Sequence, residues 1–224
     1  MDYGKAFTYP QQDAEWLKKW GIAALLMLVP VIGWVMVAGY ALEITRRVIT
    51  ENPQTLPAWD DFGEIAKKGV YAVIIGIVYN LPVFVLGICA SIPNAMATAG
   101  MDGSDSAQTM ASLFMFVSVC CSCLIFLLSI ITGIIVPAAL GKVAATNDLA
   151  AGFRIGEVVA LVRAQPAVYF IVMLIGFALG LGGLVVGLLC CSFITLSYVT
   201  LINAHLTGQA YRVAVGATPS TLSV

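Results

Sequence analysis

The six cysteines are the residues of this sequence with the greatest capacity for chemistry. Cys120 and Cys123 have the C-x2-C spacing that occurs in zinc and iron–sulfur sites. The others are Cys89, Cys121, Cys190 and Cys191. A thiolate is costly in apolar surroundings without a nearby positive charge, whereas a free thiol packs as a small apolar group. We therefore expect packing cysteines and no metal or cofactor. A disulfide between Cys120–Cys123 and Cys190–Cys191, or a redox site there, is the alternative.

Other groups that could carry chemistry are isolated. His205 is the only histidine, and we expect it at a solvated helix end. Asn80 and Pro82 lie in one apolar stretch and Pro137 in another, which predicts kinked helices of the kind found in transporters or in static bundles. The sequence has no Gly-x-Ser-x-Gly, His-Glu-x-x-His or phosphate-loop motif. We therefore predict no catalytic residues and no enzyme.

The elements that position these groups are predicted to be membrane helices. The 224 residues are 60 % hydrophobic and 10 % charged, whereas soluble domains are about 25 % charged. The mean hydropathy is +0.96 and the formal net charge is −1. These values exclude a soluble globular enzyme, a disordered chain and a nucleic-acid binder. The fold class expected is all-α, a polytopic transmembrane helical bundle in a single domain over residues 1–224.

Long stretches without charge place the membrane spans. One helix needs about 20 apolar residues to cross about 30 Å of hydrocarbon. The last uncharged stretch, 164–211, is too long for one span, and its weakest helical point is Gly180-Leu181-Gly182-Gly183. A turn there completes about four full spans, with a cytoplasmic tail at 207–224. The predicted spans are 70–98, 107–141, 165–181 and 184–206.

Polar connectors are predicted to form short interfacial helices at 12–19, 58–68 and 148–163. In the first, Trp16 and Trp20 suit the headgroup level, and Lys18 and Lys19 can reach water. In the second, Trp59, Phe62, Ile65 and Ala66 share one face, which we expect to lie on the membrane or on neighbouring spans. In the third, Arg154 and Glu157 are spaced to pair.

Segment 20–45 has two possible arrangements. The positive-inside rule places the acidic turn at 100–106 outside and the basic loops inside. If 20–45 enters the membrane and returns, breaking near Pro30 and Gly33, all 11 lysines and arginines are cytoplasmic. If it crosses fully, the N-terminus is external. We favour the re-entrant hairpin.

Four glycines, Gly176, Gly180, Gly183 and Gly187, form two small-x3-small motifs around the expected turn. Glycine permits close approach of helix backbones in lipid, where apolar burial contributes little to association. We expect the two motifs to face each other across the hairpin.

Several motifs resemble those of the domain of unknown function 4013 family. They are Leu28-Val29-Pro30-Val31-Ile32-Gly33, Gly39-Tyr40, Arg46-Arg47, Leu56-Pro57-Ala58-Trp59-Asp60-Asp61 and Lys68-Gly69. The likeness continues weakly from Pro137 to Pro166. It implies a small prokaryotic multi-span membrane protein and no activity, so no functional residue follows from it.

We expect a non-enzymatic integral protein of the plasma membrane with a structural, assembly or partner-binding role. Its partners are the lipid bilayer and another membrane protein or a second copy, with no nucleic acid. The alternative is a passive or facilitated carrier for an apolar or lipid-like solute, which the kinked, uncharged spans favour. An intramembrane redox enzyme is a third hypothesis, which depends on the cysteines alone.

Overall fold

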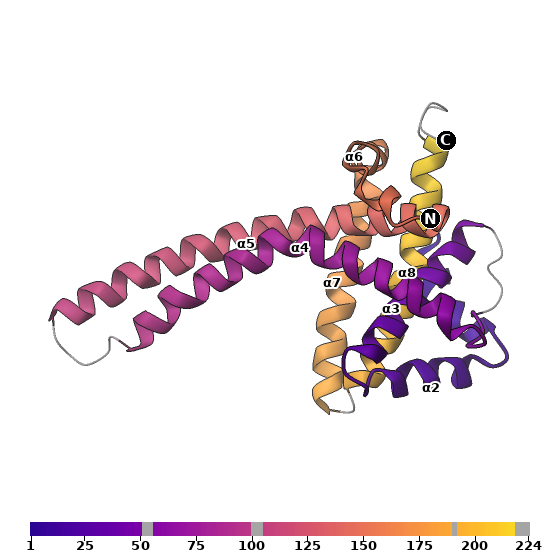
Figure 1. The fold of residues 1–224 in the computed structure, drawn as a ribbon, viewed down its shortest axis with the longest axis horizontal. Helices are drawn as coiled ribbons and strands as arrows, with labels where there is room; N and C mark the ends of the chain where they lie inside the picture. Colours follow the sequence, from indigo (N-terminus) through magenta and orange to yellow (C-terminus); the bar gives the residue numbers. More distant parts are fainter. Residues whose placement is uncertain (51–55, 100–104, 190–191, 218–224) are drawn as a thin grey trace. The chain divides into compact units, whose positions relative to one another are not determined.

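The computed structural model describes residues 1–50, 56–99, 105–189 and 192–217, and every regular element within these ranges is a helix. The all-α prediction is confirmed. The elements, shown in Figure 1, are α1 (Tyr3–Thr8), η1 (Tyr9–Gln12), α2 (Trp16–Leu26), α3 (Ile32–Ile49), α4 (Phe62–Ala99), α5 (Asp105–Thr146), η2 (Ala150–Phe153), α6 (Ile155–Ala164), α7 (Pro166–Leu189) and α8 (Ser192–Ala217).

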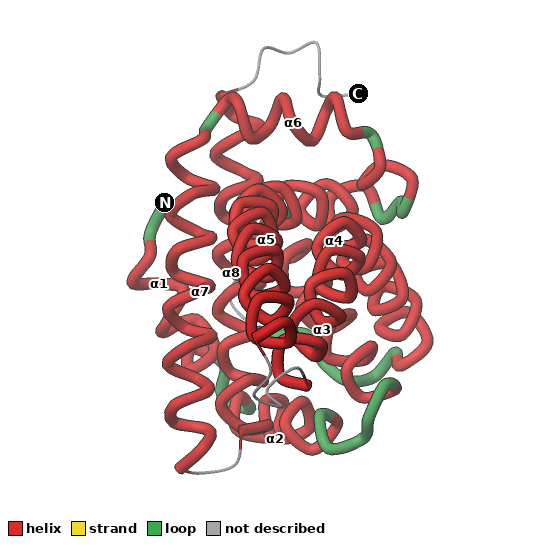
Figure 2. Tube along the Cα trace, turned by 90° about the vertical axis from the view of Figure 1, so that its left-hand side faces the viewer, coloured by secondary structure: helices red, strands yellow, loops and turns green. Residues whose placement is uncertain are grey.

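The chain divides into two compact units. The first comprises Met1–Gly76 and Ile134–Val224, and the second comprises Ile77–Gly133. In the second unit the later part of α4 and the earlier part of α5 lie side by side and run in opposite directions (Figures 1 and 2). Each unit is described separately below.

Helix α8 is the centre of the first unit. It packs against α1, α2, α3, α6 and α7. Leu201, Ile202 and Leu206 of α8 are buried, as are Tyr40 and Ile44 of α3. The core of this unit is therefore a set of helices gathered around α8.

Three described helices are long and apolar enough to cross a membrane, which indicates a membrane protein. The apolar stretches are Phe62–Ile92, Thr109–Thr146 and Pro166–Leu188. The expected span at 184–206 is not among them. Helix α8 contains polar residues that are buried within the unit, including Ser197, His205 and Thr207. Its mean hydropathy is lower than that of α4, α5 or α7. The predicted count of about four full spans is therefore approximate.

Segment 20–45 forms two helices with a break between them, at the position expected from Pro30. Val31 has a positive φ of 65°, which is rare for a β-branched residue. A Cβ on Gly33 would collide with the carbonyl oxygen of Leu26, so the tight turn requires glycine there. The 11 residues of α2 span about 16 Å, too short to cross a bilayer.

The predicted turn at Gly180–Gly183 is wrong, because α7 continues through it to Leu189. All four glycines of the motif lie on α7, so the two motifs do not face each other. Three of them still approach α8: an added Cβ would lie 3.2 Å from Asn203 Oδ1 at Gly176, 3.4 Å from a Val199 methyl at Gly183 and 2.8 Å from Ser192 Cα at Gly187. The carbonyl oxygens of Gly183 and Gly187 accept hydrogen bonds from Thr195 and Ser192. Glycines thus bring these helices together, with side chains of α8 opposite them.

The predicted tail at 207–224 is also partly wrong, because α8 remains helical to Ala217. The tail was placed immediately after the expected span. Leu206 and Ala210 are buried on either side of that limit, and contact with the rest of the first unit extends the helix beyond it.

The predicted connector 58–68 is not a separate helix. Asp61 Oδ1 accepts the backbone N–H of Glu64 at the start of α4, and the helix then runs past Gly69 without a break. Gly69 was expected to end a helix. Instead it lies where α4 crosses α3. The backbones are so close there that an added Cβ would collide with the carbonyl oxygen of Val35.

The other two connectors differ in detail. The segment 12–19 contains the end of η1 and the start of α2, and Lys19 does not extend to water as expected but binds Asp13. The segment 148–163 contains η2 and most of α6. The expected pair is present there, with 3.6 Å between Arg154 Nη1 and Glu157 Oε1.

Candidate functional site

The residues that carry the family resemblance meet where α3 crosses the first turns of α4. Gly39 of α3 faces the backbone of α4, since an added Cβ would collide with the carbonyl oxygen of Ile65. With Gly69 on the opposing helix, this allows backbone-to-backbone contact that any side chain would prevent. We call this region the α3–α4 junction.

An aromatic pair forms one side of the α3–α4 junction. The rings of Tyr40 and Trp59 stack with their centroids 4.2 Å apart and an angle of 3° between their planes. The Tyr40 hydroxyl donates to the Pro57 carbonyl oxygen at 2.9 Å, and the Trp59 indole N–H donates to the Lys19 carbonyl oxygen at 3.0 Å. Tyr40 is fully buried. The ring pair therefore fixes the segment that precedes α4 against both α2 and α3.

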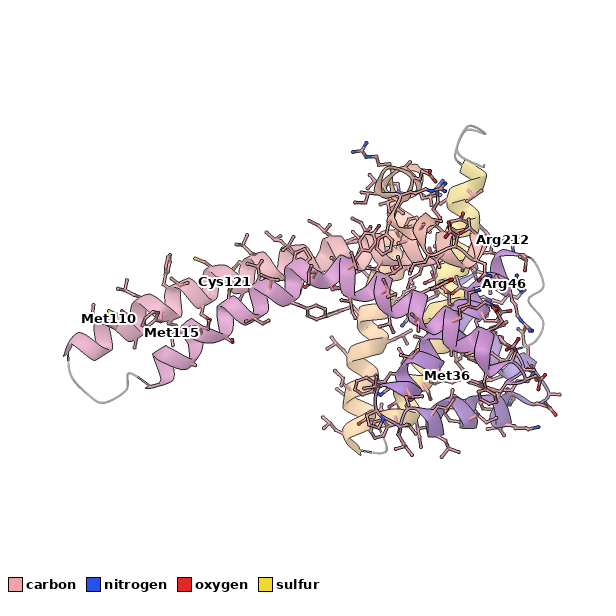
Figure 3. All side chains as sticks on the ribbon, viewed as in Figure 1. Met36, Arg46, Met110, Met115, Cys121 and Arg212 are labelled. Carbon is pink, nitrogen blue, oxygen red and sulfur yellow. The ribbon has the colours of Figure 1, made fainter. Side chains whose placement is uncertain are left out.

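An ion-pair cluster around Glu43 forms the other side. Its carboxylate lies 2.7 Å from Lys68 Nζ, 3.1 Å from Arg46 Nε and 3.3 Å from Arg47 Nε. Figure 3 labels Arg46 on α3. Burial raises the pKa of Glu43, but hydrogen bonds from Lys68 and Arg46 outweigh it, so the pKa lies below its ordinary value. Glu43 is therefore held ionised between two helices.

Asp13 makes a second buried ionic contact next to the junction. Its carboxylate binds Lys19 Nζ at 2.6 Å and accepts the backbone N–H groups of Glu15 and Leu56 at 2.7 and 2.8 Å. Burial raises the Asp13 pKa, but these hydrogen bonds lower it more, leaving it below the ordinary value. Lys19 also donates to the Leu56 carbonyl oxygen. The N-terminal segment is thus tied to the segment before α4.

A cleft of about 280 Å³ opens beside the Glu43 cluster. It is lined by Glu43, Arg47, Asp60, Asp61 and Lys68, among other residues. A carboxylate that is ionised and shared among several bases is a weak proton acceptor. Among the described residues, no group of histidine, cysteine or acidic side chains is arranged to hold a metal ion. The chemistry that this arrangement supplies is ion pairing between helices.

The described cysteines do not occupy a packed core. Cys120 and Cys123 of α5 and Cys89 of α4 are exposed, and Cys121 is half-buried. The prediction that they pack as buried residues is wrong for the three exposed ones, because these helices are covered little by the rest of the chain. Figure 3 shows Cys121 on α5, on the same helix as Met110 and Met115. Cys190 and Cys191 lie outside the described residues, as does any approach between the two cysteine groups.

The prediction of a solvated His205 is wrong. Its side chain is 2 % exposed and its ring lies 4.4 Å from that of Tyr9. Burial lowers the His205 pKa to about 4. His205 is therefore part of the packed interior of the first unit.

Pro82 and Pro137 both lie inside continuous helices, α4 and α5.

Sequence reasoning did not identify Glu43, Asp13 and Lys142 as buried charges. A signal for Glu43 was present: it is the first acidic residue after a long apolar stretch, and Arg46 and Arg47 follow at the spacings that pair on a helix. The partner of Lys142 is Glu157, which comes from a separate element. Local spacing could not have indicated that pair.

The family model described as a protein of unknown function (DUF4013) matches residues 22–192, a range that includes the whole α3–α4 junction. No curated protein and no solved structure matches the chain.

Proposed function

The chain belongs to the DUF4013 family of proteins of unknown function, and from that premise we propose that it is a non-enzymatic multi-pass protein of the prokaryotic plasma membrane. Its role in this proposal is to bind a partner protein, or a second copy of itself, through its membrane helices.

The observation that carries the proposal is the bare apolar surface of the second unit. In the most apolar stretches of α4 and α5, only 6 % of the residues are buried. Exposed large side chains extend along both helices in this unit, for example Leu81, Phe84, Ile88, Phe116 and Phe126. A surface of this kind is covered by lipid or by another protein. Two adjacent helices offer a wider apolar face than one helix that only anchors a protein in the membrane.

The ionic groups of the first unit support a structural role. Glu43 and Asp13 are each engaged by bases and by backbone or side-chain donors, as described above. Their hydrogen bonds connect helices and leave little capacity for proton transfer. The best-developed polar site therefore contributes to architecture, in agreement with a protein whose role is binding.

The contacts of the N-terminus support the re-entrant arrangement of 20–45. Asp2 exchanges hydrogen bonds with Gln209 of α8, and Arg212 donates to the Val48 carbonyl oxygen at the end of α3. The N-terminus and the end of α3 therefore lie at the same end of α8. The turn between α2 and α3 exposes apolar side chains, including Val31 and Ile32, which suits entry into a bilayer.

Labelling of single cysteines tests this topology. In a cysteine-free background, a probe at Ser104 should react with an impermeant maleimide outside intact cells, whereas probes at Gln54 and Thr8 should be protected. Ser104 and Gln54 lie outside the described residues. External labelling at Gln54 would reverse the orientation, and external labelling at Thr8 would favour the full crossing.

Purification in a mild detergent tests the role. We expect a stoichiometric protein partner or a defined homo-oligomer. Replacing Phe116 and Phe126 by alanine should release it, while the control Leu188→Ala, at an exposed apolar position of α7 in the first unit, should retain it. A monomer without a partner that keeps its native melting temperature would contradict the proposal.

A carrier for an apolar or lipid-like solute is the second candidate, and a groove favours it. The groove has a volume of about 500 Å³ and is lined by Trp16, Trp20, Gly182, Gly183 and Tyr198, among other residues. Small-molecule sites have volumes of roughly 300–1,000 Å³. A lipid that co-purifies at one per chain, and is lost when Gly183→Leu fills the groove, would support this alternative.

A further inference from the structure

A third cavity in the first unit lies between the N-terminal segment and α8. Its volume is about 370 Å³, and the residues that line it include Asp2, Lys5, Val48, His205, Gln209 and Arg212. Figure 3 labels Arg212 on α8. The cavity is separate from the α3–α4 junction and from the groove at Trp16 and Trp20.

We propose that this cavity binds the phosphate group of an anionic ligand. The proposal is independent of the partner-binding role and depends on the donors and charges described next. The phosphate can belong to a lipid headgroup or to a soluble phosphate, and the experiment below distinguishes these sources.

Two side-chain cations line the cavity, Lys5 and Arg212. The described residues provide no ion pair for Lys5. Arg212 is anchored at the wall by a long hydrogen bond of 3.5 Å from Nη1 to the Val48 carbonyl oxygen. Arginine presents several donors in a planar fork, and lysine adds a compact point charge. Together they suit an anion with several acceptor oxygens.

His205 supplies a neutral donor whose tautomer is fixed by its neighbours. Gln209 Oε1 accepts the Asp2 backbone N–H at 2.9 Å, and Gln209 Nε2 donates to the Asp2 carbonyl oxygen at 3.0 Å. These two bonds orient the amide, so Nε2 is also the donor to His205 Nδ1, 3.0 Å away. A neutral ring that accepts at Nδ1 carries its proton on Nε2. Among the described residues none accepts that proton, although the side chain is 98 % buried (2 % exposed).

Asp2 is the one carboxylate among the residues named for the cavity, and its charge opposes an anion. Its Oδ1 accepts the Lys5 backbone N–H at 3.0 Å and is thereby engaged in capping α1. Against it stand two lining cations, Lys5 and Arg212. A phosphate oxygen in the cavity would accept from His205 Nε2, for which the described residues supply no acceptor.

The predicted topology places this cavity on the cytoplasmic side of the bilayer. The basic residues of the chain are predicted to be cytoplasmic, and anionic lipids give that leaflet a negative surface potential. In this topology a lipid headgroup would reach the cavity from that leaflet. A soluble phosphate would reach it from the cytoplasm.

The single histidine makes the site directly observable. The full chain, labelled with 15N-histidine, is placed in phosphatidylcholine nanodiscs and titrated with inorganic phosphate, and separately in nanodiscs that contain phosphatidylglycerol. We expect a saturable shift of the Nε2–H resonance. A shift with both additions assigns the phosphate group itself, a shift with phosphatidylglycerol alone assigns a lipid headgroup, and a shift with inorganic phosphate alone assigns a soluble ligand.

Variants then tie the shift to the cavity. Lys5→Gln should weaken binding at least tenfold, Lys5→Arg should retain it, and Lys18→Gln should leave it unchanged, because Lys18 is an exposed base that does not line the cavity. If Lys5→Gln changes the resonance of the unliganded protein, Arg212→Gln replaces it as the test. An unmoved resonance in both titrations, or an equal shift in the Lys5 and Arg212 variants, overturns the proposal.

Discussion

At the scale of single residues, the first unit pairs the charged groups that it buries. Glu43 shows this most clearly, with donors from its own helix and from α4. Its carboxylate compensates Lys68, whose side chain is only 11 % exposed. A buried ion pair is weak evidence for net stability, but removing one partner leaves an uncompensated charge.

The first prediction concerns Glu43. Glu43→Gln should lower the free energy of unfolding by about 3 kcal/mol, because Lys68 would lose its closest carboxylate. Thermal unfolding in detergent measures this. Glu64→Gln is the matched control, since Glu64 is 46 % exposed and lies 3.9 Å from the same lysine; its effect should stay within about 1 kcal/mol. Equal melting temperatures for the two variants would contradict the assignment.

The second prediction concerns pH. Burial lowers the His205 pKa from 6.5 to about 4, so the unfolded chain binds a proton more readily than the folded one. The contribution of His205 to the free energy of unfolding is fully present above pH 6.5. It falls by about 1.4 kcal/mol per pH unit as the pH decreases toward 4. Melting temperatures at pH 7.5, 6 and 5 should therefore decrease. His205→Gln should remove most of the decrease in this window, and an unchanged pH dependence in that variant would be contrary evidence.

At the scale of elements, glycines determine how closely helices approach. Gly187 is close to the backbone of α8, whereas a Cβ on Gly180 would meet open space. The same substitution in the same helix should therefore have two different outcomes.

The third prediction uses this contrast. Gly187→Ala should destabilise the protein by about 1–3 kcal/mol through overpacking against Ser192. Gly180→Ala should be neutral or slightly stabilising, since alanine favours a helix. Thermal unfolding of both variants in one detergent checks this. A loss of stability at Gly180 equal to that at Gly187 would mean that helix distortion, and not contact with α8, controls the effect.

The sequence was sufficient for the helical class and for the break near Pro30, because apolar stretches and proline act locally. It was not sufficient for the ends of the helices. Gly69 and Gly180–Gly183 were interpreted as helix breakers, but each lies within a helix where contact with a neighbour, or continuous apolar surroundings, maintains the helix. The α3–α4 junction was predicted only as a motif. The pairing of Glu43 with Lys68 depends on tertiary contact, which spacing does not encode.

At the scale of the whole molecule, the described part of the chain combines a unit with a buried core and a unit whose apolar side chains remain uncovered. The second unit needs an apolar environment, which the bilayer supplies. Thiols on its surface should report that environment.

The fourth prediction concerns those thiols. A variant with Cys123 as its only cysteine should react slowly with a water-soluble maleimide in nanodiscs, although Cys123 is exposed in the chain, because thiolates do not form readily in hydrocarbon. Denaturation should restore the reaction, and elemental analysis should find no stoichiometric zinc, iron or copper. Immediate labelling in nanodiscs, or one metal per chain that Cys120→Ala removes, would contradict the lipid-covered surface.

The position of α8 at the centre of the first unit also has a consequence for biosynthesis. Helices α1, α2 and α3 leave the ribosome well before their shared partner α8, and Asp2 and Gln209 are 207 positions apart. Until translation reaches α8, the early helices lack the surface that buries them. Nascent chains that stop before Ser192 should therefore be recognised by quality-control proteases, and the early segments should depend on the insertion machinery or on chaperones to remain unaggregated until α8 is made.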